Sequence, residues 1–160
     1  MSDRDEWGAQ VAGAIAVLMQ RGTRAQLYGI LVEGVGPAIN ETTYPVLSGL
    51  ARTGPRSAAV LATEIGIDRS VTSRHASRLE AAGLLRREPD PSDRRATLLV
   101  LTPDGERVVE VMRRRLARAV GDYLATWDPA EAGAFVASLS RFVEEGPWDR
   151  LPASTGTDSD

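Results

Sequence analysis

The 160-residue chain carries 19 basic and 22 acidic side chains, a net charge of −3, and 42% apolar residues. This length and apolar content predict one compact domain with a core of its own. Because cysteine is absent and histidine occurs once, disulfides, thiol chemistry and a multi-histidine metal site within one chain are excluded, and we expect no cofactor or metal.

No targeting segment is evident in the sequence. The first apolar run, residues 11–19, follows a cluster of acidic residues, which is the wrong charge for a signal peptide. No stretch is long enough to cross a bilayer. We therefore expect a cytoplasmic protein without a membrane partner.

The first third of the chain is predicted to be helical. Residues 7–33 place apolar side chains at helical spacing, and Gly22 and Gly29 weaken this helix enough to favour a bend. A second helix is expected over residues 42–52, before the break at Gly54-Pro55.

The middle of the chain predicts a helix-turn-helix. Residues 57–65 form a short helix with Ser57 as its cap, and Gly66 ends it. Asp68 then caps a second helix over residues 68–82, which Gly83 ends. Two short helices joined by a tight turn that contains glycine are typical of this motif.

A β-hairpin follows at residues 84–101. Leu84 to Glu88 and Ala96 to Leu101 have the composition of strands, and the polar, turn-rich residues between them form the tip of a wing. Thr102-Pro103 starts a long helix to about residue 126, and a last helix covers residues 128–145. We expect a mainly α fold with a small β-hairpin wing, and a disordered tail at residues 153–160.

The helix over residues 68–82 has two unlike faces. At about 100° per residue, Thr72, Ala76 and Leu79 share the face that should pack inward. Hydroxyls and arginines lie on or near the opposite face, where they could bond bases or phosphates in a major groove. These candidate DNA-binding residues are Ser70, Ser73, Arg74, Ser77 and Arg78, with Val71 at the edge. An ordinary solvated face is the alternative interpretation.

Arginines also gather on the wing. Residues 68–95 contain seven arginines and five acidic residues, and the hairpin tip reads Asp93-Arg94-Arg95. An arginine at such a tip can enter a narrow minor groove, where the potential is most negative. The alternative is a charged hairpin whose side chains only keep the protein in solution.

The segment from Leu61 to Thr102 resembles the MarR family of transcription regulators. It reads LATEIGIDRSVTSRHASRLEAAGLLRREPDPSDRRATLLVLT, and it includes the family's Asp-x-Arg at Asp93 and Arg95, followed by Leu-Thr at 101–102. This match covers about a quarter of the chain. The flanking helices agree with the family in order and length.

The resemblance implies one MarR-like domain over residues 1–160, with a winged helix-turn-helix lobe at 42–101 and helical dimerisation regions at 7–33 and 103–145. It implies a homodimer on pseudo-palindromic double-stranded DNA and a small aromatic effector between the two regions. Arg94 and Arg95 would serve the wing, and Asp93 would orient a neighbouring arginine. We expect a ligand-responsive repressor.

Some positions depart from the family pattern. Thr72 and Ala76 replace larger aliphatic side chains, which predicts a looser core beneath the helix unless other residues fill it. His75 lies at the boundary of the inner face, where a partly buried histidine is the simpler interpretation and a pH switch the alternative. Tyr44 and Trp127 are expected either to line an effector pocket or to belong to the core.

Two other kinds of function compete with this interpretation. An enzyme is not expected, because the nucleophile, phosphate-loop and dinucleotide motifs are all absent from the sequence. The second alternative is a winged-helix module that binds a protein without binding DNA, which the acidic net charge favours. The arginine-rich wing and the hydroxyl-rich helix face favour DNA.

Overall fold

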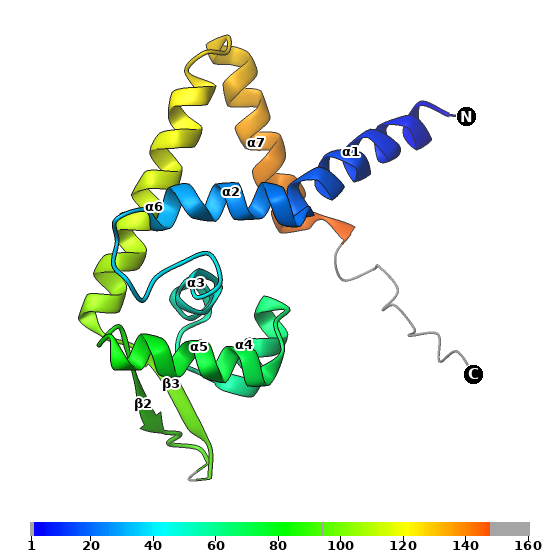
Figure 1. Ribbon diagram of the computed structural model, residues 1–160. Helices are drawn as coiled ribbons and strands as arrows, with labels where there is room; N and C mark the ends of the chain where they lie inside the picture. The colour runs from blue at the N-terminus through cyan, green and yellow to red at the C-terminus, as the bar shows by residue number, and fades with distance from the viewer. Residues whose placement is uncertain (1, 94, 148–160) are drawn as a thin grey trace. The chain divides into compact units, whose positions relative to one another are not determined.

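The computed structural model describes residues 2–93 and 95–147 (Figure 1). The described part is mainly helical with one small antiparallel sheet, which confirms the predicted fold class. Its elements, in chain order, are α1 (Asp3–Met19), α2 (Arg21–Val32), α3 (Tyr44–Thr53), β1 (Arg56–Ser57), α4 (Ala58–Ile65), α5 (Arg69–Ala81), β2 (Leu85–Pro89), β3 (Thr97–Leu101), α6 (Pro103–Leu124) and α7 (Pro129–Glu145).

The chain divides into two compact units. The first extends to Ala117 and the second begins at Arg118, so α6 contributes residues to both. Each unit is described by itself below. The helix-turn-helix, the sheet and both sides of every cavity discussed here belong to the first unit.

The first helical segment is divided into two helices. The sequence predicted a bend near a glycine, but the break falls at Gln20, whose φ of −59° and ψ of 139° leave the helical region. The backbone ends α1 at Met19 and starts α2 at Arg21. No described residue of α1 is buried in the isolated chain, and Leu18 and Met19 are each 66% exposed.

Side-chain caps define the helix-turn-helix. The Ser57 hydroxyl accepts a hydrogen bond from the Val60 backbone N–H at the start of α4. Gly66 ends α4 in the left-handed conformation, with φ of 66°, where a Cβ would be strained. The Ile67 N–H then bonds back to the Ala62 carbonyl, which tightens the turn into α5.

The sheet has the strand order β1-β3-β2. β2 and β3 form the hairpin, with Leu85 opposite Leu101 and Pro89 opposite Thr97. β1 pairs with the other edge of β3 through Arg56 and Ser57. A strand of two residues is too short for an alternating pattern, so β1 was not predicted.

The core lies in the first unit, where α3, α4, α5, the hairpin and the first part of α6 meet. Thr72, Ala76 and Leu79 of α5 are buried, as the helical wheel predicted. Fully burying each leucine in this core contributes about 2 kcal/mol to folding. The largest fully buried apolar side chains are Leu31, Leu47, Leu61, Leu79, Leu85, Leu99, Met112 and Val46.

The hairpin joins α6 through one residue, Thr102. Its backbone N–H donates to the Leu84 carbonyl (3.1 Å) and its hydroxyl donates to the Gly83 carbonyl (2.6 Å). A Cβ at Gly105 would collide with the same Leu84 carbonyl. Glycine at this position therefore allows α6 to start directly against the base of the wing.

The second unit contains the end of α6 and all of α7. Trp127 contacts Tyr123 and Phe135, with ring centroids 5.8 and 5.2 Å apart. Many of its apolar side chains are exposed in the single chain: Val120, Tyr123, Phe135, Val136, Leu139 and Val143. Within residues 2–93 and 95–147, no helix is long and apolar enough to span a membrane.

Candidate nucleic-acid interface

The start of α5 is fixed by Asp68. Its carboxylate accepts hydrogen bonds from the backbone N–H groups of Ser70 (2.7 Å) and Val71 (3.2 Å), and from the Ser70 hydroxyl (2.5 Å). These bonds lower the pKa of Asp68, and the bond from the Ser70 hydroxyl has a larger effect than either backbone bond. The Ser70 hydroxyl is therefore part of the cap, although the side chain remains exposed.

The exposed arginines of the first turns of α5 are available to a ligand. Arg74 is exposed, and Ser73 next to it is half-buried. Arg69, which was not among the residues predicted from the helical wheel, is also exposed in the first position of α5. It precedes Ser73 by four residues, and this helical spacing could have identified it. Neither guanidinium group has a hydrogen bond or an ion pair with another described residue.

The second half of α5 is bonded internally. Arg87 of β2 donates from Nη2 to the Ser77 hydroxyl (3.0 Å) and from Nε to the Glu80 carboxylate (3.0 Å). Arg78 donates from Nη2 to the Pro37 carbonyl (2.8 Å), 41 residues away in sequence. Ser77 and Arg78 are thus exposed, as predicted, but both already have protein partners.

Val71 and His75 lie beside a cavity of about 370 Å³ between α2 and the helix-turn-helix. Arg21, Arg24 and Tyr28 of α2 line the same cavity. Burial, and then the charges of Arg74 and Arg78, lower the pKa of His75, so its neutral form is favoured at pH 7. Val71 was predicted at the edge of the DNA-binding face, and the structure places it against this cavity.

Hydrogen bonds order the tip of the wing. Asp93 accepts from the backbone N–H of Arg95 (2.9 Å), and Asp90 accepts from the backbone N–H and the hydroxyl of Ser92. Asp93 therefore shapes the turn that carries Arg95, which is exposed. Arg94, a predicted wing residue, lies outside the described residues.

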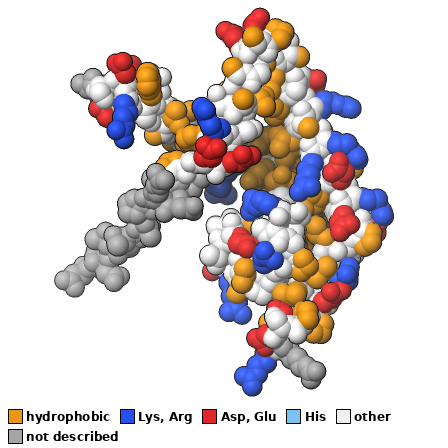
Figure 2. All heavy atoms as spheres, turned by 180° about the vertical axis from the view of Figure 1, so that it is seen from behind, with side chains coloured by type: hydrophobic (Ala, Val, Ile, Leu, Met, Phe, Trp, Pro, Cys, Tyr) orange, Lys and Arg blue, Asp and Glu red, His pale blue; other side chains and the backbone are white. Residues whose placement is uncertain are grey.

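Charges of both signs surround the hairpin. Arg86 pairs with Glu88 at 2.6 Å, and Arg87 pairs with Glu80 at 3.0 Å. Figure 2 shows basic and acidic side chains close together at the hairpin end of the molecule. The wing is therefore not a uniformly basic surface. Any contact with DNA here would come from single exposed arginines and not from a continuous basic patch.

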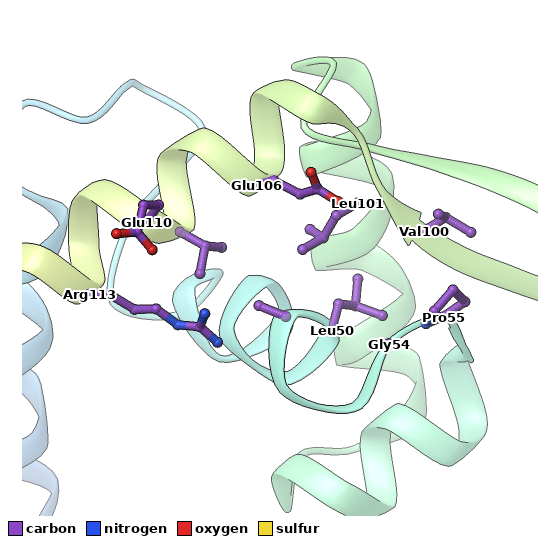
Figure 3. A pocket seen from close by; sticks show the side chains of 10 residues that line it. Leu50, Gly54, Pro55, Val100, Leu101, Glu106, Glu110 and Arg113 are labelled. Carbon is purple, nitrogen blue, oxygen red and sulfur yellow. The ribbon is translucent and has the colours of Figure 1, made fainter.

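A second cavity, of about 360 Å³, lies between α3, β3 and the start of α6 (Figure 3). Leu50 and Leu101 form apolar parts of its wall, and Glu106, Glu110 and Arg113 line it from α6. This mixed charge does not favour nucleic acid.

The two aromatic residues proposed as pocket or core have separate surroundings. Tyr44 packs on Tyr28, with ring centroids 4.7 Å apart, and burial raises its pKa. Trp127 belongs to the ring cluster of the second unit. Neither residue lines the two cavities described above. Within residues 2–93 and 95–147, no cluster of histidine or acidic side chains could hold a metal ion.

Comparison with known proteins identifies the family. A family model described as the MarR family matches residues 37–96. The chain is 30% identical, over 71% of its length and 66% of the relative, to a putative transcriptional regulatory protein for the hcr operon of Thauera aromatica. The matched segment thus spans about two-thirds of that relative.

Solved structures agree with this assignment. The transcriptional regulator BldR from Sulfolobus solfataricus has a TM-score of 0.66 and 25% identity, over 91% of this chain and 99% of that one. PcaV from Streptomyces coelicolor, solved in complex with its natural ligand, has a TM-score of 0.52 and 28% identity, over 80% and 94% of the two chains. The chain belongs to the MarR family of winged helix-turn-helix, DNA-binding transcription regulators.

Proposed function

We propose that this protein is a homodimeric, sequence-specific DNA-binding repressor that responds to a small ligand. One observation carries the proposal. The first turns of α5 expose Arg69 and Arg74, whose guanidinium groups have no hydrogen bond or ion pair with any other described residue, and the adjacent wing exposes Arg95. The N-terminal half of a recognition helix is the part that reaches base edges.

The two arginine groups have different roles in this proposal. Arg74 lies in the major groove, where its guanidinium bonds guanine bidentately, and Ser73 contacts a base or a phosphate. Arg95 enters the flanking minor groove or holds a phosphate. Asp93 supports this second contact, because its carboxylate accepts a hydrogen bond from the Arg95 backbone N–H.

The exposed apolar side chains of α1, α6 and α7 favour a dimer. Trp7 is 65% exposed, Tyr123 63% and Leu139 48% in the single chain. Large exposed apolar areas of this kind are rare on monomers, and a second copy would cover them. Two chains would then present two α5 helices to half-sites about 34 Å apart on pseudo-palindromic DNA.

The cavity lined by Tyr28 and His75 is the proposed effector site. Tyr28 offers an aromatic surface, and Arg21 and Arg24 outnumber Glu41, the one acidic side chain of the same lining, so the cavity favours an acidic group. Because Val71 and His75 belong to α5, a ligand here touches the recognition helix directly. Such a ligand releases DNA only if it binds the DNA-incompetent arrangement more tightly.

The test is to measure binding of the protein to the intergenic DNA upstream of its own gene. Scrambled DNA is the competitor, and the measurement is repeated over a series of salt concentrations. We expect binding by two chains per site that weakens steeply with salt. Replacing Arg74 with Ala should reduce the binding free energy by about 1–3 kcal/mol and relax the preference at one base position. Arg95→Ala should weaken binding to all sequences. Arg52→Ala, which removes an exposed arginine in the last turn of α3, is the control.

Other results would favour the alternative module, which binds a protein without DNA. Flat salt dependence, or no specific binding in a genome-wide selection of fragments, would contradict the DNA-binding role. Leu139→Arg tests the dimer separately, because a buried charge should yield monomers by light scattering whereas Leu139→Met should not. Hydroxybenzoates, which combine an aromatic ring with an acidic group, are suitable first probes of the cavity, read as loss of DNA binding.

A further inference from the structure

The second half of α5 is joined to a loop 41 residues away in sequence and to the wing strand that follows it in the chain. Arg78 bonds to the loop between α2 and α3 through the Pro37 carbonyl. On another side of the helix, Ser77 and Glu80 accept hydrogen bonds from Arg87 of the wing. This half of the helix is therefore connected both to the α2–α3 loop and to β2.

The loop that receives Arg78 is internally ordered. Thr43 is fully buried, and its hydroxyl donates to the Ala38 carbonyl (3.0 Å) and accepts from the Asn40 N–H (2.9 Å). The Asn40 side-chain oxygen accepts from the backbone N–H groups of Thr42 and Thr43, each at 3.0 Å. These bonds order the loop between Ala38 and Thr43, directly after the Pro37 carbonyl that accepts from Arg78.

The strand geometry directs Arg87 toward α5. Side chains alternate across a strand, so Arg87 lies on the same face of β2 as Leu85, which is buried in the core that α5 helps to form. The ion pair of Arg87 and Glu80 is partly exposed, with 36% and 38% side-chain accessibility, so it contributes little to stability. Its effect is geometric, because it links the wing to one side of the helix.

We propose that Arg78 and Arg87 are positioning residues that set the inclination of α5 on DNA, and that sequence reading is confined to the half of α5 that contains Arg69, Ser73 and Arg74. This inference rests on the proposed function. It reassigns Ser77 and Arg78, which the helical wheel placed among the DNA contacts, to the support of the helix.

Glu80→Gln gives the decisive measurement, because it leaves Arg87 in place. If Arg87 were a DNA contact held back by Glu80, releasing it would strengthen operator binding. As a positioning residue, Arg87 loses its charged partner and keeps only neutral acceptors, the Ser77 hydroxyl among them, so the ratio of operator affinity to scrambled-DNA affinity should fall about three- to tenfold. Glu106→Gln, an exposed charge on α6, is the control for the change in net charge.

Arg78→Ala provides the second measurement. A positioning role predicts a similar fall in the affinity ratio, with unchanged affinity and salt dependence on scrambled DNA. If Arg78 instead bound a phosphate directly, the salt slope on scrambled DNA should be smaller by about 0.9 for each phosphate that the variant no longer neutralises. Thermal unfolding, measured in parallel, identifies a variant that does not fold.

The outcomes separate the two proposals. Specific binding by the unmodified protein together with a stronger complex for Glu80→Gln, or a reduced salt slope for Arg78→Ala, would overturn the positioning role alone. A fall in the ratio for both variants, at unchanged thermal midpoints, would support it. Absence of specific binding by the unmodified protein would overturn the proposed function and this role together.

Discussion

Replacing Thr72 with Val should stabilise the protein. Thr72 is fully buried on the inner face of α5, and its hydroxyl is the one buried side-chain oxygen or nitrogen within residues 2–93 and 95–147 that has no hydrogen-bond partner. An unsatisfied buried hydroxyl costs about 1–3 kcal/mol. Valine has the same shape and a similar helix propensity, so the free energy of unfolding should rise by about 1–2 kcal/mol.

The measurement is urea unfolding at one fixed protein concentration, since dimerisation would make stability depend on concentration. The midpoint should rise with an unchanged slope, and the melting temperature should rise by about 2–8 °C. Thr43→Val is the matched control, because Thr43 is equally buried but its hydroxyl bonds Ala38 and Asn40. That variant should be less stable by about 1–3 kcal/mol. An unchanged or lower stability for Thr72→Val would refute the reasoning.

Three further predictions concern the first unit. Gly105→Ala should lower stability by about 1–3 kcal/mol in urea unfolding, because its Cβ would collide with the Leu84 carbonyl; an unaltered midpoint would contradict the close approach. The lowered pKa of His75 means that the folded state favours its neutral form, so stability should decline as the pH falls below about 6.5. His75→Gln should remove that part of the decline, which thermal unfolding at about pH 5.5 and pH 7.5 measures. Arg115→Met should lower the melting temperature, since Arg115 bonds the Leu31 and Glu33 carbonyls at the end of α2; equal melting temperatures would indicate that water replaces those bonds.

Helix boundaries were predictable where a single residue starts or ends the helix through its own conformation or its bonds to neighbouring backbone groups. Asp68 caps α5 and Gly66 ends α4 for reasons that involve only neighbouring backbone groups, so the sequence places both correctly. The break at Gln20 was not predicted, because the residue there is neither glycine nor proline and its backbone conformation has no local sequence signal. The same holds for the two-residue strand β1, which depends on β3 for its pairing.

The candidate site was predictable only in part, because periodicity defines a face and not a partner. The helical wheel correctly predicted that Thr72 is buried and that Arg74 and Arg78 are exposed. It could not distinguish Arg74, whose guanidinium group has no hydrogen bond or ion pair among the described residues, from Arg78, whose guanidinium donates to Pro37, 41 residues away. Contacts between distant segments decide this difference, and a single sequence does not encode them in any simple pattern.

The one-residue junction between β3 and α6 has a consequence for variation in chain length. Thr102 bonds both Gly83 and Leu84, so an inserted residue there would shift the start of α6 away from the carbonyl that Gly105 approaches. The hydrogen bonds of the described residues in the turn between β2 and β3 join that turn only to itself, and lengthening an exposed loop costs little closure entropy. Insertions should therefore be tolerated at the hairpin tip and rejected at its base, so the reach of the wing along DNA can change while the core stays the same.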